Sequence, residues 1–357
     1  MNTFGEKIRV TVFGQSHAPA IGVTVDGLPC GVSIDQEELY KFMLRRAPGT
    51  SNTSTSRKEA DRPVIVSGLN DKGLTCGAPL TALIYNSDAH SKDYSELFMR
   101  PRPSHADFPA WIRYGENYDI RGGGQFSGRL TAPLCIAGGI LMQILKAKGI
   151  HIGAHILSVN DVRDFGFDMA NVSANELENI KSKNFPTIDD AAAESMKEKI
   201  LFAKQNLDSV GGVVECAAVG LEPGLGEPEF CGIENAVSQA VFAIPAVKGI
   251  EFGLGFESTL LYGSENNDEY AFDGQKTVTL TNNAGGICGG MTTGMPIVFR
   301  TSFKPTPSIA KAQNSVDLAS HENIKLEIKG RHDPCVVVRA VPCVEAAAAI
   351  AISQFVL

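Results

Sequence analysis

Residues 121–129 read Arg-Gly-Gly-Gly-Gln-Phe-Ser-Gly-Arg and are followed by an apolar run that ends at Gly149. In this run apolar residues recur every three or four positions from Leu130 to Leu145, which predicts a helix. Lys146 lies in its last turn, and a lysine before a glycine is typical of a helix end. A glycine loop that enters a helix N-terminus can bind an anion, especially between two arginines. We therefore expect a ligand-binding loop here; the alternative is a glycine turn without a ligand.

The composition describes a globular protein of ordinary polarity. Of its 357 residues, 43% are hydrophobic and 20% are charged, and the net charge of −8 argues against a general nucleic-acid binder. We find no apolar run of about 18 residues, as a membrane span requires, and no signal core at the N-terminus. We therefore expect a cytoplasmic chain without a membrane segment. Its eight cysteines form no Cys-x-x-Cys pair, which favours reduced and mostly buried thiols.

Arginine and histidine lie in loops suited to anion binding and proton transfer. Arg45 and Arg46 end a predicted helix, and Arg102 precedes His105 and Asp107 in a segment that prolines hold extended. Arginine recognises phosphate and carboxylate in a bidentate manner, and a loop histidine can transfer protons. The alternatives are solvated arginines and structural histidines. We expect His151 and His155, which share a strand face, to be structural rather than metal ligands.

The hydrophobic pattern predicts both strands and helices. A capping box at residues 33–36 is expected to start the helix that ends at Arg46. We predict strands at residues 8–13, 21–25, 64–66, 80–85 and 335–340, and exposed helices at residues 178–183 and 191–205.

The chain also repeats itself. Gly22-Val-Thr-Val, followed by a helix, is similar to Gly212-Val-Val-Glu, and Thr75-Cys-Gly-Ala-Pro-Leu80 is similar to Thr292-Thr-Gly-Met-Pro-Ile297. The offsets of about 190 and 217 differ by a tolerable loop insertion. We predict an α+β fold with two related halves around a quasi-twofold axis. The halves are expected at residues 1–150 and 206–357, joined by a helical segment at residues 151–205, with a ligand where their glycine loops converge.

Three later stretches carry further candidate site residues. Residues 282–290 and 304–308 offer backbone N–H groups, hydroxyls and a lysine, which suit a second anion cradle. Residues 331–333 read Arg-His-Asp, where a carboxylate beside arginine can stay ionised and act as a base; the alternative is a structural ion pair. Together these features favour an enzyme that acts on a multiply anionic substrate.

The order of these motifs resembles the chorismate synthase family, from about Phe4 to the C-terminus. The matching stretches are Phe13-Gly-Gln-Ser-His17, Arg45-Arg46-Ala-Pro-Gly-Thr50, Arg102-Pro-Ser-His-Ala-Asp107, Tyr118-Asp-Ile-Arg-Gly-Gly-Gly124, Ala246-Val-Lys-Gly249, Asn283-Ala-Gly-Gly286, Lys304-Pro-Thr306, Gly330-Arg-His-Asp-Pro-Cys335 and Arg339-Ala-Val-Pro342. The resemblance implies a β-α-β sandwich built by internal duplication and a homotetramer. It also implies a carbon–oxygen lyase that makes chorismate by 1,4-anti elimination of phosphate from 5-enolpyruvylshikimate 3-phosphate, the last common step of the shikimate pathway to aromatic amino acids. The reaction needs reduced FMN, although it has no net redox change.

The resemblance assigns roles by position. His17 matches a general acid near the leaving phosphate, His105 a histidine that supports reduced flavin, and Asp333 a base that works with the flavin to remove the C6 proton. The implied proton-network serines are Ser16 and Ser127. The implied substrate ligands are Arg45, Arg46, Arg129 and Arg339. The implied flavin-site residues are Gln125, Phe126, Ser127, Pro245, Ala246, Gly289, Lys304, Pro305, Thr306, Pro307, Ser308 and Arg331, and no metal is implied.

The chain departs from the family pattern in several places while keeping the implied acid, base and flavin histidine. The departures are at Gln15, Asn52, Gln125, Phe126, Pro245 and Pro307. We interpret the chain as a divergent but active branch. Asn52 replaces a family arginine, which favours an outside reductant over use of NAD(P)H. The alternatives are an inactive paralogue that binds an anionic metabolite or flavin, and a different phosphate-eliminating lyase on the same scaffold.

Overall fold

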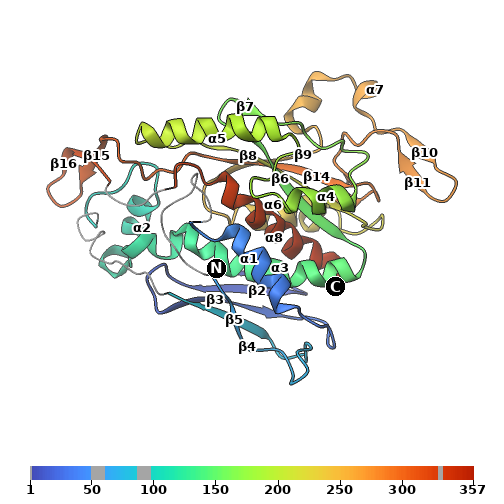
Figure 1. The fold of residues 1–357 in the computed structure, drawn as a ribbon, viewed down its shortest axis with the longest axis horizontal. Coiled ribbons are helices and arrows are strands. Elements are labelled where there is room, and N and C mark those ends of the chain that lie inside the picture. The colour runs from blue at the N-terminus through green and yellow to red at the C-terminus, as the bar shows by residue number, and fades with distance from the viewer. Residues whose placement is uncertain (1, 50–60, 87–97, 329–332) are drawn as a thin grey trace.

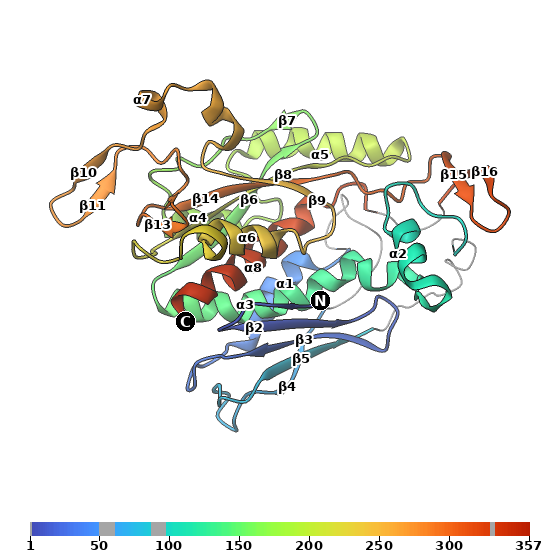
Figure 2. The ribbon, with the colours of Figure 1, turned by 180° about the vertical axis from the view of Figure 1, so that it is seen from behind.

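The computed structural model describes residues 2–49, 61–86, 98–328 and 333–357. Two five-stranded sheets enclose a layer of helices, so the chain is an α+β sandwich as predicted (Figures 1 and 2). The first sheet, in the order β1-β2-β3-β5-β4, consists of β1 (Thr3–Phe4), β2 (Arg9–Gly14), β3 (Ala20–Asp26), β4 (Val64–Ser67) and β5 (Leu80–Tyr85). The second sheet, in the order β7-β6-β8-β14-β9, consists of β6 (His151–Val159), β7 (Val162–Arg163), β8 (Gly212–Val219), β9 (Val247–Phe252) and β14 (Ile297–Phe303).

Helices fill the space between the sheets and cover one outer face. The inner layer consists of α1 (Gln36–Arg46), α3 (Thr131–Ala147), α6 (Ile233–Val241) and α8 (Val337–Val356). On the outer face of the second sheet lie α4 (Ala174–Lys181) and α5 (Asp190–Gln205). Two short helices are α2 (Asp107–Tyr114) and α7 (Gly263–Asn266). The 3₁₀ turns are η2 (Gly115–Asn117), η3 (Arg121–Phe126), η4 (Gly128–Leu130), η5 (Glu229–Cys231) and η6 (Gly255–Leu260). Three small hairpins pair β10 (Tyr270–Phe272) with β11 (Thr277–Thr279), β12 (Ile287–Cys288) with β13 (Met291–Thr292), and β15 (Gln313–Asp317) with β16 (Glu322–Leu326).

The two halves repeat one topology. In the first half β2, β3, α1, β4, β5 and α3 follow one another, and β6, β8, α6, β9, β14 and α8 follow in the second. The corresponding sheet orders, β2-β3-β5-β4 and β6-β8-β14-β9, are the same, and every pairing is antiparallel. The expected boundary is wrong, however: the second half begins with β6, because residues 151–159 pair with β8 in its sheet. The helical insertion therefore lies inside the second half, between β7 and β8.

The equivalent helices α3 and α8 form the centre of the inner layer. A Cβ atom built on Gly138 would lie 2.3 Å from the Cα of Ala346, so the two backbones are in contact there. One turn earlier, the sulfurs of Cys135 and Cys343 are 3.8 Å apart. Both pairs are separated by the same number of residues, so the helices run parallel, as a quasi-twofold axis that runs along them gives. Both are long and apolar enough to cross a membrane, but they are core helices whose apolar windows are 67% and 83% buried.

Three local predictions are corrected by the structure. The predicted strand at residues 335–340 is not formed: residues 337–340 are the first turn of α8, because the valines are followed by the alanine-rich run that packs on α3. The cap of α1 is Asp35 rather than Ser33, since the Asp35 carboxylate accepts hydrogen bonds from the N–H groups of Glu37 and Glu38. The helix expected at residues 178–183 begins earlier, where Ser173 caps α4. The strands expected at residues 8–13, 21–25, 64–66 and 80–85 are confirmed as β2 to β5.

His155 is structural, as expected. It is fully buried on β6, where its Nε2 lies 3.0 Å from Glu215 on β8 and its Nδ1 lies 3.5 Å from Asp164. The Asp164 carboxylate also accepts hydrogen bonds from the N–H groups of Ile188 and Asp189, so this cluster attaches the helical insertion to the sheet. Burial opposes protonation of His155, but hydrogen bonds with Asp164 and Glu215 outweigh it and raise the pKa of the imidazole.

We predict that His155→Gln lowers the free energy of unfolding by about 3 kcal/mol, because the variant leaves two buried carboxylates without their cation. The folded-state pKa of His155 lies above its unfolded value of about 6.5. The stabilisation is therefore complete below that value and is lost as pH rises through the folded pKa.

Urea unfolding of wild type and variant across this pH range tests the prediction. The difference between them should shrink as the pH rises, and a difference that does not change with pH would contradict it. The exposed His321, with a positive φ that asparagine tolerates, provides the control variant His321→Asn.

Candidate active site

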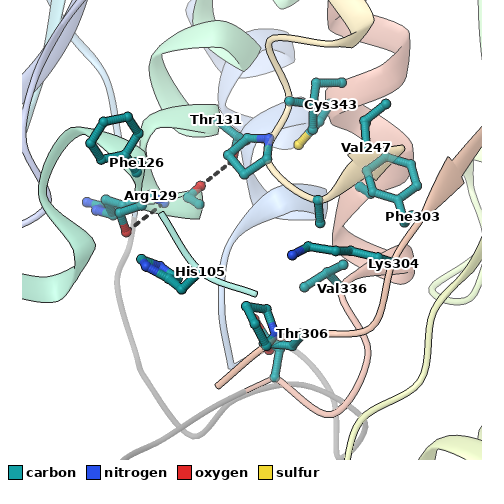
Figure 3. Close-up of a pocket in the computed structure, with 18 of the residues that line it drawn as sticks. His105, Phe126, Arg129, Thr131, Val247, Phe303, Lys304, Thr306, Val336 and Cys343 are labelled. Atoms are coloured by element: carbon teal, nitrogen blue, oxygen red, sulfur yellow. Dashed lines mark hydrogen bonds between the residues drawn. The ribbon is translucent and has the colours of Figure 1, made fainter. Parts of the chain in front are cut away.

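A cavity of about 660 Å³ lies at one end of the inner helix layer. Residues from both halves line it, and Figure 3 shows His105 and Arg129 facing Lys304 and Phe303 across it. Most of the site residues implied by the sequence meet here. They are Arg46, His105, Gln125, Phe126, Ser127, Arg129, Pro245, Ala246, Lys304, Thr306, Pro307, Ser308, Asp333 and Arg339.

The glycine loop forms part of the cavity wall. Gly122, Gly123 and Gly124 have φ values of 61°, 85° and 56°, which favour glycine over other residues. A Cβ on Gly122 would lie 2.2 Å from the ring of His17, and one on Gly124 would lie 2.1 Å from a backbone carbonyl. The loop then enters α3, as predicted. Only one of its flanking arginines reaches the cavity: Arg129 lines it, whereas Arg121 points outward and pairs with Asp119.

A buried carboxylate joins two of the cavity arginines. Asp61 contacts the guanidinium groups of Arg46 and Arg129, and all three side chains are almost fully buried. Arg46 also donates to the Thr131 hydroxyl at 3.0 Å and to the Gly128 carbonyl at 3.1 Å. Burial opposes ionisation of Asp61, but the two arginines outweigh it and lower the pKa of this carboxyl. Asp61 therefore holds both guanidinium groups in fixed positions at the cavity.

Asp107 holds Arg102 and His105 in fixed positions in the same way. Its carboxylate accepts hydrogen bonds from Arg102 at 2.7 and 2.8 Å, and its Oδ1 lies 2.6 Å from Nδ1 of His105. Burial opposes ionisation of Asp107, but the bonds from Arg102 and His105 hold its pKa below the usual value. The short contact places a proton on Nδ1 of His105, which leaves Nε2 to exchange a proton with a ligand. The predicted grouping of these three residues is confirmed.

Asp333 lies just before α8, and Arg339 lies in its first turn. Arg339 donates to the Asp333 carboxylate at 2.5 Å and to the Arg46 carbonyl at 3.0 Å. Because Asp333 lies outside the helix, the short segment 334–336 that leads into α8 brings its carboxylate to Arg339. Because Arg129 precedes α3 and Asp333 precedes α8, the parallel helices direct both N-termini towards the cavity, where their dipoles favour an anion.

The opposite wall combines cations, hydroxyls and apolar groups. Lys304 donates to the Ser104 carbonyl at 2.5 Å, and burial together with the charge of Lys248 lowers the pKa of its ammonium. The hydroxyl oxygen of Thr306 is buried and has no hydrogen-bond partner among the described residues. The apolar lining includes Phe126, Phe242, Ile244, Val247 and Phe303.

The remaining implied site residues lie outside this lining. His17 and Ser16 are buried behind Gly122. Arg45 turns to another face of α1, because successive helix residues point about 100° apart, and forms a bidentate pair with the buried Glu345. Gly289 and the rest of the cradle expected at residues 282–290 lie elsewhere, around the half-buried β12–β13 hairpin. Pro305 does not line the cavity, and Arg331 and Asn52 are outside the described residues.

Two residues at the cavity, Asp61 and Cys343, could not be recognised from local sequence patterns. Asp61 carried no recognisable motif, since a single aspartate in a polar stretch is usually solvated. Cys343 has no motif of its own in the sequence, although its position four residues after Arg339 places both side chains on one face of α8. Both residues depend on partners that are distant in sequence.

Comparison with known proteins shows similarity to one family over nearly the whole chain. A family model described as chorismate synthase matches residues 8–357. Chorismate synthase of Lancefieldella parvula is 46% identical over 361 residues, covering 98% of this chain and 95% of its own length. That of Thermococcus kodakarensis is 44% identical, with 99% and 97% covered. A solved crystal structure of chorismate synthase has a TM-score of 0.78 at 27% identity, covering 99% of this chain and 92% of the other.

We predict that Asp61→Asn lowers the free energy of unfolding by about 3 kcal/mol, because two buried guanidinium groups lose their shared counter-charge. Its lowered pKa means that the stabilisation is present above the unfolded value of about 3.9 and is lost as pH falls through the folded pKa. Urea unfolding measures the change. The control is Asp26→Asn, whose exposed pair with Arg9 should contribute less than about 1 kcal/mol; equal effects of the two substitutions would contradict the prediction.

Proposed function

The chain belongs to the chorismate synthase family of carbon–oxygen lyases, and we propose that it converts 5-enolpyruvylshikimate 3-phosphate to chorismate by 1,4-anti elimination of phosphate. The family acts in aromatic amino acid biosynthesis. One observation carries the proposal for this chain: a cavity lined by both halves combines three fixed arginines, a histidine and a carboxylate. These are the groups that an elimination of phosphate from a carboxylate-bearing substrate needs.

The arginines would bind the anionic groups of the substrate. Arg46 and Arg129 are held by Asp61, and Arg339 is held by Asp333 and the Arg46 carbonyl. Their positions are therefore set before the ligand arrives, which reduces the cost of ordering long side chains on binding. The positive charge also stabilises the leaving phosphate as negative charge develops on it.

The cavity fits a flavin mononucleotide beside the substrate. Its volume of about 660 Å³ is within the usual range for cofactor sites, and its apolar wall suits a flat ring system. The hydroxyl of Thr306, which has no partner among the residues the structure describes, and the ammonium of Lys304 offer hydrogen bonds to polar parts of the cofactor. When bound, reduced FMN supplies the transient electron density that no side chain in this cavity can provide. Gln125, Phe126, Pro245 and Pro307 line the cavity, so these four family departures do not remove its walls.

The proton chemistry falls to His105 and Asp333. Because Asp107 accepts from Nδ1 of His105, the Nε2 atom is left to hold or release a proton on the cavity side. The Asp333 carboxylate can accept the proton removed from carbon while Arg339 keeps it in place. His17 stands behind Gly122 at the cavity wall. We propose it as the acid for the leaving phosphate, with Ser16 and Ser127 in the same network.

We expect wild-type protein to form chorismate from this substrate under anaerobic conditions with chemically reduced FMN. Asp333→Asn and His105→Ala should each lower the rate by at least about 100-fold, the usual contribution of an acid–base group. Chorismate absorbance or chromatography measures the product. The matched controls are Asp71→Asn and His321→Asn, which change exposed residues outside the cavity.

No turnover by folded wild-type protein that still binds flavin would favour the inactive paralogue. Elimination of phosphate from another substrate would favour a different lyase. In the same assay we expect NADPH with free FMN not to replace the chemical reductant, since Asn52 stands where the family has an arginine. Clear turnover with NADPH would contradict this expectation.

We also propose a homotetramer in which an arm of the second half contributes to the contacts. Residues 254–281 project from the body of the molecule (Figure 1), and they expose several large apolar side chains. These are Phe256, Leu260, Tyr262, Tyr270 and Phe272, each more than 70% exposed. Exposed apolar groups gathered in this way are typical of protein–protein contact sites.

We predict that the double substitution Tyr270→Glu and Phe272→Glu produces a smaller assembly, because it places two charges in an apolar contact. Light scattering after size-exclusion chromatography measures the mass of the assembly. Phe165→Glu, which changes an equally exposed phenylalanine outside the arm, should leave the mass unchanged. A tetramer that survives the double substitution would exclude the arm from the contacts.

A further inference from the structure

Two buried thiols meet where the central helices reach the cavity. The sulfur of Cys135 on α3 donates a hydrogen bond to that of Cys343 on α8, across 3.8 Å. Cys135 is fully enclosed in the core, whereas Cys343 lines the cavity and Figure 3 shows its sulfur on the cavity side. A small solute that enters the cavity therefore meets one thiol directly, with a second thiol immediately behind it.

The helix packing holds these sulfurs within reach of a covalent bond. One turn after the cysteines, Gly138 and Ala346 bring the two backbones into contact. Since α3 and α8 run parallel and side by side, Cys135 and Cys343 lie at the same height along the two helices. A disulfide requires a sulfur–sulfur distance of about 2.05 Å and closely spaced Cα atoms. Side-chain rotation between helices already in contact can close the remaining gap.

The charges around the pair make the two thiols different. The hydrogen bond from Cys135 lowers the pKa of Cys343 against the effect of burial, and Arg46 and Arg339 act in the same direction. Burial raises the pKa of Cys135 well above the usual value. Cys343 is therefore the thiol that ionises, and a thiolate rather than a thiol is the reactive nucleophile.

We propose that Cys343 is a peroxide-reactive thiol and that Cys135 is its resolving partner, so that a hydroperoxide in the cavity closes a disulfide between α3 and α8. The Cys343 sulfur attacks the peroxide, the O–O bond breaks, and a sulfenic acid and water (or an alcohol) form. The Cys135 sulfur then attacks the sulfenic sulfur, the S–O bond breaks, and a second water leaves. Two thiols lose two electrons and two protons, and the peroxide takes up both.

Closing the disulfide also affects the cavity wall. Arg339 lies one turn before Cys343, and the Cys343 sulfur contacts its carbonyl at 3.3 Å. Drawing the Cys343 side chain towards α3 breaks this contact and moves the start of α8, which positions Arg339 against Asp333. Oxidation should therefore lower turnover reversibly. This last consequence rests on the proposed function, whereas disulfide formation itself does not.

The test uses the full-length protein with the exposed Cys30, Cys76, Cys231 and Cys288 changed to serine. After treatment with hydrogen peroxide and alkylation of free thiols, peptide mass mapping without reductant should show residues 135 and 343 cross-linked, with a loss of about 2 Da. Dithiothreitol should reverse the change. The buried Cys216 and Cys335, which have no second thiol beside them among the described residues, should remain free after the same peroxide treatment.

Cys135→Ser in the same background separates the two roles. Without its resolving partner, Cys343 should gain about 32 Da as a sulfinic acid that dithiothreitol does not reverse. If the serine background does not fold, differential alkylation of the unaltered chain gives the same peptide readout. The proposal is overturned if Cys135 and Cys343 both remain free after peroxide treatment of folded protein, or if Cys343 is oxidised equally in both variants without a cross-link. Cross-linking without loss of turnover would contradict only the effect on the cavity.

Discussion

The contact between α3 and α8 is the constraint on which the rest of the structure depends. A glycine at position 138 lets the two backbones touch at Ala346, and no side chain larger than hydrogen fits there without moving one of the helices. The helices run parallel, so their first turns lie at the same end of the molecule. Each half then adds its own sheet on the outside, and the cavity forms where the two N-termini and their preceding loops meet.

Parallel helices with adjacent N-termini concentrate positive potential, and the cavity adds several arginines to it. Such an arrangement is unfavourable without compensating charge. Three carboxylates provide the compensation in the chain itself: Asp61 for Arg46 and Arg129, Asp107 for Arg102, and Asp333 for Arg339. The same carboxylates fix the cations in place. The four arginines are thus held in place before any ligand binds, and three carboxylates against four guanidinium groups leave the site a net positive charge.

The two halves repeat one fold, but they contribute different groups to the site. The two halves share strand order and central helices, but the loops before those helices differ. The loop before α3 supplies three glycines and Arg129, whereas the segment before α8 supplies Asp333. The second half also carries the helical insertion, which the cluster of His155, Asp164 and Glu215 attaches to its sheet. Equivalent positions can therefore carry different chemistry, and both kinds of group face one cavity.

Local patterns in the sequence determined most of the strands of the first half, α3 with its glycine loop, the repeat, and the grouping of Arg102, His105 and Asp107. Each of these depends on residues that are close in the chain, where periodicity and turn chemistry act directly. The family resemblance added most of the cavity residues. The tertiary structure alone decided that residues 335–340 lead into a helix and that β6 is the first strand of the second half. It also decided that Arg45 pairs with Glu345 whereas Arg46 lines the cavity. It also decided the roles of Asp61 and Cys343, because long-range packing sets which distant groups a buried charge or thiol meets, and no local pattern carries that information.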